Sequence, residues 1–353
     1  MFVENFIKKT KGVKSERTRK ILEIQREWTE QLKKCDEVEL YIIKSTVIIA
    51  GTCTGFVSNR IIRDVEFDYV IVDEAAKATF PELAVSLNKA HKIILVGDHQ
   101  QLPPVLDTEI IRNNKEKLDE EGLAQGIFER MYNMFPEDNK HRLTIQYRMH
   151  PTIGTLISHV FYNDEIQNGV EAQDRELCIE GYEGIAIEWI STSKYSTKER
   201  YEKEFDNNGK KSYQNYLERN IIERKLLELD SKLVKRTKVA VITGYGSQKY
   251  ILQTMVKQHS FKHIEVDVDT VDAFQGSQKD IILYSTVRSS GNKYGIGFLK
   301  SEARINVAFS RARCLLIIVG DMKFLDNYKI RGNKFPEIIK YITESEGCRI
   351  IEK

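Results

Sequence analysis

Short apolar runs rich in Val and Ile recur along this chain, and amphipathic segments separate several of them. Strands buried on both faces of a parallel sheet have this pattern, because helices cover both sides of such a sheet. Nine runs fit it: residues 46–50, 69–72, 92–96, 143–146, 185–190, 238–243, 264–268, 280–285 and 315–319. Between runs, apolar residues step by three and four, as Leu217, Ile221 and Leu226 nearly do. The alternation predicts an α/β fold of doubly wound parallel sheets.

The length of 353 residues suits two domains, at about 150 residues each, or one large domain. A proline and a cluster of charges at 135–142 mark the expected break between the two halves. Residues 1–44 carry no strand pattern, so we expect one or two helices outside the sheet. The Lys-, Glu- and Asn-rich insert at 192–211 is expected to be a surface loop, and residues 331–353 a C-terminal helix and tail.

Composition excludes several classes of protein. Lys and Arg number 54 and Asp and Glu 52, a net charge of +2, so any basic surface must be local. The five cysteines are scattered without a C-x-x-C pair, which argues against a disulfide framework or structural zinc and favours a reducing compartment. We expect the cytoplasm, and the pattern does not exclude the nucleus. No apolar run approaches the roughly 20 residues that cross a bilayer.

Two carboxylates, Asp73 and Glu74, follow the run FDYVIV directly. Open α/β sheets bind their ligands at the carboxyl ends of the strands. One carboxylate there can hold Mg²⁺ through water, while its neighbour orients an attacking water. Taken alone, the pair also fits a solvated loop or the start of a helix.

Three further segments carry polar side chains that suit a phosphate or a base. The loop GDHQQLPP at 97–104 is stiffened by two prolines and can sense a phosphate, although it also fits a plain connection. Tyr147 and Arg148 offer a stacking surface beside a planar guanidinium. Arg311 and Arg313 fall in a segment expected to be helical, where they would point about 200° apart, so only one could face a site.

In this order and spacing the segments resemble the superfamily 1B helicases, in particular the branch that contains the RNA helicase of nonsense-mediated decay. The resemblance covers residues 45–321 through STVIIAGTCTGF, VIVDEAAKAT, ILVGDHQQLPPV, LTIQYRMHP, FYNDEIQNGV, VDTVDAFQGSQKDIILYSTVRS, GIGFL and INVAFSRARCLLIIVGD. It implies RecA-like domains: a helical stalk remnant at 1–44, the C-terminal part of a first RecA-like domain at 45–136, and a complete second one at 142–330.

The resemblance also implies ATP and Mg²⁺ as cofactors. Asp73 would bind Mg²⁺, and Glu74 would polarise the hydrolytic water. Gln101 would read the γ-phosphate from the first domain, and Tyr147 would stack on the adenine.

From the second domain, Arg148 and Arg311 would reach the γ-phosphate as catalytic fingers. Gln278 lies in the segment that would link the nucleotide to the bound strand. Thr52 and Thr270 would contact backbone phosphates of single-stranded RNA or DNA, with 5′→3′ translocation. The spacing of residues does not distinguish RNA from DNA.

The chain departs from the family pattern at two positions. Lys77 stands where the relatives most often have Gln, and its role is left open. Gln278 stands where Glu is common, which keeps the hydrogen bonding but removes the charge.

The sequence contains no G-x-x-x-x-G-K-[ST] loop, which supplies the amides and the lysine around the β- and γ-phosphates. Two functions are therefore weighed. One is an ATP-dependent helicase present as a fragment, or completed by an N-terminal polypeptide that carries the loop, with the isolated chain inactive. The other is a non-catalytic nucleic-acid-binding or regulatory module. The retained site residues favour the first, and the missing loop favours the second.

Overall fold

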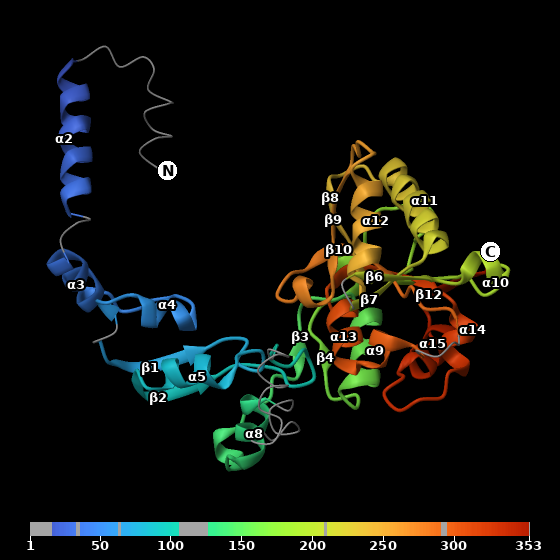
Figure 1. Ribbon diagram of the computed structural model, residues 1–353, viewed down its shortest axis with the longest axis horizontal. Coiled ribbons are helices and arrows are strands. Elements are labelled where there is room, and N and C mark those ends of the chain that lie inside the picture. The colour runs from blue at the N-terminus through green and yellow to red at the C-terminus, as the bar shows by residue number, and fades with distance from the viewer. Residues whose placement is uncertain are drawn as a thin grey trace. The chain divides into compact units, whose positions relative to one another are not determined.

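The computed structural model describes residues 16–32, 36–62, 65–105, 126–207, 210–290 and 295–352. The chain forms two compact units (Figure 1). The first unit comprises Met1–Gly97 and Val105–Phe128, and the second comprises Asp98–Pro104 and Glu129–Lys353. None of the helices in these described stretches is long and apolar enough to span a membrane.

The first unit contains a parallel pair of strands with helices before and between them. Its elements are α2 (Glu16–Leu32), α3 (Asp36–Ser45), α4 (Cys53–Ser58), β1 (Phe67–Val72), α5 (Phe80–Leu87) and β2 (Ala90–Leu95), followed by the start of α8 (Ile127–Met134). The small core consists of Val72, Ala75, Ala76, Leu83 and Phe128. Helix α5 begins at a capping box, in which the Glu82 carboxylate accepts the backbone N–H of Thr79 at 2.8 Å. The hydrogen bonds from Thr79 lower the pKa of Glu82.

The predicted strand at 46–50 is absent from the structure. These residues have irregular backbone, and Val47 and Ile48 are 97% and 82% exposed. A strand exists only when a neighbour completes its hydrogen-bond ladder, and none of the described segments pairs with this run.

The second unit is built on a six-stranded sheet in the order β12-β5-β11-β10-β8-β9, with every neighbouring pair parallel. These strands are β5 (Ile187–Ser191), β8 (Thr237–Thr243), β9 (Ile264–Thr270), β10 (Lys279–Ser285), β11 (Ala312–Gly320) and β12 (Cys348–Glu352). The larger helices are α9 (Pro151–Phe161), α11 (Tyr216–Lys232), α12 (Gly246–Val256), α13 (Glu302–Phe309), α14 (Met322–Asn327) and α15 (Phe335–Glu344). The prediction of a doubly wound, RecA-like α/β fold is confirmed.

Alternate residues of the strands enter two separate cores, one on each face of the sheet. Trp189 of β5 and Tyr284 of β10 pack with α9, α13 and α15. Ile190 and Leu283, their neighbours in sequence, pack with α11 and α12. Burial on both faces explains why the strands appear in the sequence as continuous apolar runs.

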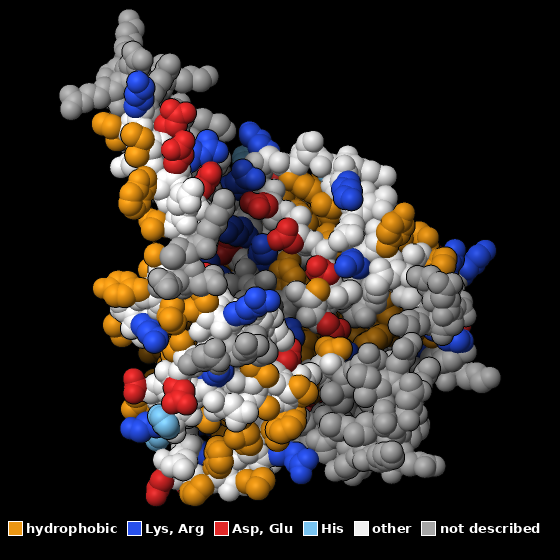
Figure 2. All heavy atoms as spheres, turned by 60° about the vertical axis from the view of Figure 1, so that its left-hand side comes forward, with side chains coloured by type: hydrophobic (Ala, Val, Ile, Leu, Met, Phe, Trp, Pro, Cys, Tyr) orange, Lys and Arg blue, Asp and Glu red, His pale blue; other side chains and the backbone are white. Residues whose placement is uncertain are grey.

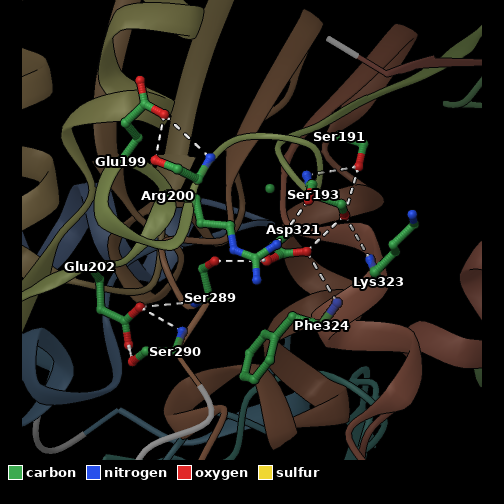
Figure 3. Close-up of polar contacts among 12 residues, drawn as sticks. Ser191, Ser193, Glu199, Arg200, Glu202, Ser289, Ser290, Asp321, Lys323 and Phe324 are labelled. Atoms are coloured by element: carbon green, nitrogen blue, oxygen red, sulfur yellow. Dashed lines mark hydrogen bonds and ion pairs between the residues drawn. The ribbon is translucent and has the colours of Figure 1, made fainter.

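The insert at 192–211 is folded, which corrects the expectation of a surface loop. It contains α10 (Thr197–Arg200) and an antiparallel hairpin of β6 (Lys203–Asn207) and β7 (Lys210–Gln214). Its anchor is the fully buried Asp321 carboxylate, which accepts the hydroxyls of Ser193 at 2.7 Å and Ser289 at 2.8 Å (Figure 3). Arg200 of the insert lies 3.3 Å from the same carboxylate. The charge at the end of β11 thus holds the insert against the sheet.

A second buried carboxylate, Glu218 of α11, holds the backbone that leaves β10. Val287 has a φ of 67°, a left-handed conformation that is strained for a β-branched residue. Glu218 accepts the N–H of Val287 at 2.9 Å and the hydroxyl of Ser285 at 2.6 Å. Burial raises the pKa of Glu218 to about 8, and these hydrogen bonds oppose the shift.

Candidate nucleotide site

Asp73 and Glu74 lie in the turn that follows β1 in the first unit, and both are exposed. The Asp73 carboxylate accepts the N–H of Glu74 at 2.9 Å. Glu74 has a φ of 54°, a conformation that costs energy in a residue with a Cβ and occurs often at functional sites. An exposed carboxylate at the carboxyl end of a strand has the chemistry that Mg²⁺ requires, so Asp73 fits the metal role.

The exit of β2 passes close to this turn. Ala75 donates its N–H to Val96 O at 2.8 Å, and a Cβ added at Gly97 would lie 2.8 Å from the backbone nitrogen of Ala76. Gly97 therefore lets the two strand exits approach each other. Lys77 is exposed in the same turn, and its N–H closes the turn on Glu74 O at 3.0 Å.

The loop Asp98–Pro104 packs within the second unit. Leu102 is 5% exposed and belongs to the core that contains α9 and α13. The Asp98 carboxylate accepts the hydroxyl of Tyr162 at 2.6 Å and the amide of Gln101 at 2.8 Å. Asn306 donates to Gln100 O at 3.1 Å and to the Tyr162 hydroxyl at 2.8 Å. Burial and the neighbouring Asp98 carboxylate raise the pKa of Tyr162.

Arg311 and Gln101 are in direct contact. Arg311 is 2% exposed, and its Nη2 lies 3.1 Å from Gln101 Oε1. Its Nε donates to Val307 O at 3.1 Å. The Gln101 amide is in turn oriented by Asp98, so the side chain that would sense a γ-phosphate is held at both ends.

The expectation that both SRAR arginines lie on a helix is wrong. Helix α13 ends at Phe309, Arg311 lies in the turn that follows, and β11 begins at Ala312. Pairing with β10 starts β11 at Ala312 and overrides any local helical preference, and β5 joins the strand from Leu316 onward. Arg313 lies in the strand and donates to Asp280 at 2.8 Å.

Tyr147 and Arg148 follow β3 (Ile145–Gln146), which pairs with β4 (Gln167–Asn168). The Tyr147 side chain is 63% exposed, so its ring is available for stacking. Arg148 Nη1 lies 3.4 Å from Ser310 O, and Arg311 Nη2 lies 3.2 Å from Ser310 Oγ. The second unit thus brings Gln101, Arg148 and Arg311 together around Ser310.

The remaining predicted site residues belong to other elements of the two units. Thr52, in the first unit, caps α4 by accepting Gly55 N–H at 3.0 Å. Thr270 ends β9, and Gln278 is exposed immediately before β10. The structure also reveals roles for Asp98, Tyr162 and Asn306, which no spacing pattern singles out because each acts by contacting a distant segment.

Comparison with known proteins identifies the family of the chain. Two AAA domain families match the chain, at residues 4–109 and 123–323. A regulator of nonsense transcripts 1 homolog from Neurospora crassa is 34% identical over 301 residues, covering 83% of this chain and 26% of that protein. The ATP-dependent helicase NAM7 of Saccharomyces cerevisiae is 34% identical over 90% of this chain and 31% of its own length.

The match to a third relative covers a larger share of that relative's length. An uncharacterized ATP-dependent helicase of Methanocaldococcus jannaschii is 29% identical, and the match covers 97% of this chain and 48% of that protein. The chain thus spans between about a quarter and a half of these relatives. With a six-stranded parallel sheet, a family match over residues 123–323 and relatives at 34% identity, the chain belongs to the superfamily 1 helicases of the nonsense-mediated-decay helicase branch.

Proposed function

We propose that this chain is part of an ATP-dependent helicase that moves 5′→3′ along single-stranded RNA or DNA. The observation that supports it best is the cluster of Gln101, Arg148 and Arg311 around Ser310. Buried or half-buried guanidiniums beside an amide suit the terminal phosphate of a nucleotide, because a planar guanidinium can bond two phosphate oxygens at once.

The proposed roles follow the chemistry of each group. Asp73 would hold Mg²⁺, whose charge would offset that of the phosphates, and Glu74 would orient the attacking water. Arg148 and Arg311 stabilise the negative charge that develops on the transferred group. Tyr147 stacks on the base, and Thr52 and Thr270 contact the phosphates of the bound strand.

We further propose that an N-terminal polypeptide carrying the phosphate-binding loop completes the first domain, either within the same protein or as a separate chain. Parallel sheets are ordinarily covered on both faces. In the first unit, Tyr69 and Ile71 of β1 are 54% and 66% exposed, and Ile93 and Ile94 of β2 are 42% and 46% exposed. Figure 2 shows apolar side chains at the surface of the face that it draws. Further strands and helices of a RecA-like domain would cover these residues.

The test compares the purified chain with a core completed by the N-terminal region of an intact relative. We expect negligible ATP turnover from the chain alone, because its sequence lacks the G-x-x-x-x-G-K-[ST] loop whose amides and lysine oppose the charge of the triphosphate. The completed core should show turnover stimulated by single strands, and should unwind duplexes with a 5′ overhang in preference to a 3′ overhang. Turnover of about 1 s⁻¹ or more by the chain alone, within the usual enzyme range, would contradict the proposal.

The alternative is a nucleic-acid-binding or regulatory module without catalysis. The absence of the loop sequence favours it. It predicts that the completed core binds single strands with no ATP turnover, and that Glu74→Gln leaves every measurable property unchanged.

A further inference from the structure

Arg175 lies at the end of the short 3₁₀ helix Ala172–Arg175. Its side chain hydrogen-bonds the backbone of the loop that carries Tyr147 and Arg148. Its Nη2 donates to Tyr147 O at 2.7 Å, and its Nε donates to Arg148 O at 2.9 Å. A third bond, from Nη1 to Asp174 O at 2.9 Å, holds the guanidinium to its own turn. One planar fork therefore binds two successive carbonyls of a loop 27 residues away in the sequence.

The N–H groups of the same loop are bound by another side chain. Gln146 Oε1 accepts the N–H of Arg148 at 2.9 Å and of Met149 at 2.8 Å. Its Nε2 donates to Asn168 Oδ1 at 2.7 Å, which fixes the amide in this orientation. Side chains thus supply the hydrogen bonds to the loop backbone that a strand ladder or a helix would ordinarily provide.

The ring of Tyr147 is supported from one side by the backbone of Gly169. A Cβ added at Gly169 would lie 2.4 Å from Cε1 of the ring. Gly169 donates its N–H to Gln146 O at 2.9 Å, so this support is itself tied to β3. Because the side chain remains 63% exposed, the ring is braced and still accessible.

We infer that Arg175 is a positioning residue of the nucleotide site, which holds Tyr147 and Arg148 in place before a nucleotide binds. The inference rests on the proposed function, in which the Tyr147 ring stacks on a purine base and Arg148 reaches the terminal phosphate. A fixed ring and backbone lose less conformational entropy on binding than mobile ones, and they keep the phosphate contact aligned. Lysine can replace the arginine only in part, since an ammonium has no planar fork that matches two carbonyls.

The first experiment uses the chain as it is and needs no nucleotide. Hydrogen exchange is measured for peptides covering 146–150 in the parent, Arg175→Ala, Arg175→Lys and Arg224→Ala. Arg224 is the matched control, because its Nε also bonds a backbone carbonyl, that of Asn220, on an exposed face of α11. We expect roughly tenfold faster exchange in Arg175→Ala, because the loop loses two hydrogen bonds. Arg175→Lys should be intermediate and Arg224→Ala unchanged.

The second experiment measures ATP hydrolysis in the completed core. Arg175→Ala should raise the KM for ATP about tenfold and lower kcat by a smaller factor, while thermal unfolding shifts little. Gly169→Ala perturbs the ring from the other side, so it should raise KM while leaving exchange at 146–150 slow.

Two results overturn the inference: exchange at 146–150 in Arg175→Ala that equals that in Arg224→Ala, or an unchanged KM despite faster exchange. If the parent core itself shows no turnover with ATP, the proposed function fails, and the exchange data still decide whether Arg175 holds the loop.

Discussion

Arg311 donates from Nη2 to the Gln101 side-chain oxygen across 3.1 Å, so two residues proposed for the γ-phosphate are bonded to each other. A phosphate oxygen is a stronger acceptor for a guanidinium than a neutral amide, because both partners are then charged. A nucleotide would therefore replace this bond with a stronger one. Gln101 would be released from Arg311 while Asp98 still holds its amide group.

Arg311→Ala in a completed core should lower kcat by about three decades with a modest change in nucleotide affinity. An arginine finger accelerates phosphoryl transfer by roughly 10³–10⁵-fold. Arg313→Ala is the control, since it removes an ion pair with Asp280 and should lower the melting temperature while sparing most of the rate. Steady-state kinetics and thermal unfolding decide. A stably folded but inactive Arg313→Ala, beside a nearly normal Arg311→Ala, would reverse the assignment.

Variants of the two carboxylates of the first unit should affect different steps: one should weaken nucleotide binding and the other should slow ATP turnover. Glu74→Gln in the completed core should bind Mg²⁺-ATP nearly as the parent does but hydrolyse it very slowly, because the acceptor that orients water is lost. Asp73→Asn should weaken binding in the presence of Mg²⁺. Titrations with and without Mg²⁺, together with kcat, test the division. Equal losses of affinity in both variants would reject it.

Tyr162→Phe should loosen the loop Asp98–Pro104. The change removes the 2.6 Å hydrogen bond to the Asp98 carboxylate and the acceptor for Asn306. Loss of a buried hydrogen bond to a charged group costs about 1–3 kcal/mol in unfolding free energy. Denaturant unfolding and amide exchange at 98–104 measure the effect. Tyr250→Phe is the control, because Tyr250 is 68% exposed. Exchange at 98–104 equal to the control would contradict the role of Tyr162.

Stability should fall with rising pH through the titration of Glu218. Burial raises its pKa in the folded protein to about 8 from the ordinary glutamate value of 4.5, so the folded state binds the proton more tightly than the unfolded chain does. The contribution is therefore complete below pH 4.5 and is lost as pH rises to about 8, at up to about 1.4 kcal/mol per pH unit.

Glu218→Gln tests this dependence. The variant should be less stable at low pH, because an amide cannot accept all the bonds from Ser285, Thr286 and Val287. Its unfolding free energy should nevertheless change less between pH 5 and 8 than that of the parent. Parallel curves for the two proteins would show that Glu218 does not titrate in this range.

Prediction from the sequence succeeds where local pattern and tertiary environment agree. The strands of the second unit are buried on both faces, so the apolar runs at 238–243 and 280–285 identify β8 and β10 almost to the residue. The family resemblance assigns both Gln101 and Arg311 to the γ-phosphate, and the structure adds the hydrogen bond between them.

The features that the sequence does not predict share a physical cause, because each depends on contacts with residues far away in the sequence. The insert at 192–211 looks like a loop because its anchors, Asp321 and the backbone after β10, are about a hundred residues away in the sequence. The run at 46–50 has strand composition but no ladder partner among the described residues. The role of Arg175 depends on three carbonyls, and backbone groups leave no trace in a side-chain pattern.

The packing of Leu102 matters for anyone who divides this protein for recombinant expression. A fragment that starts at Arg142 lacks Leu102, so it would have a cavity in the core of the second unit. It would also lack Asp98, the hydrogen-bond acceptor of the Tyr162 hydroxyl. Such a fragment should aggregate or melt early, and its poor behaviour would be mistaken for intrinsic instability of the domain. A fragment that starts at Asp98 keeps both contacts, so the useful cloning boundary lies more than forty residues upstream of the apparent one.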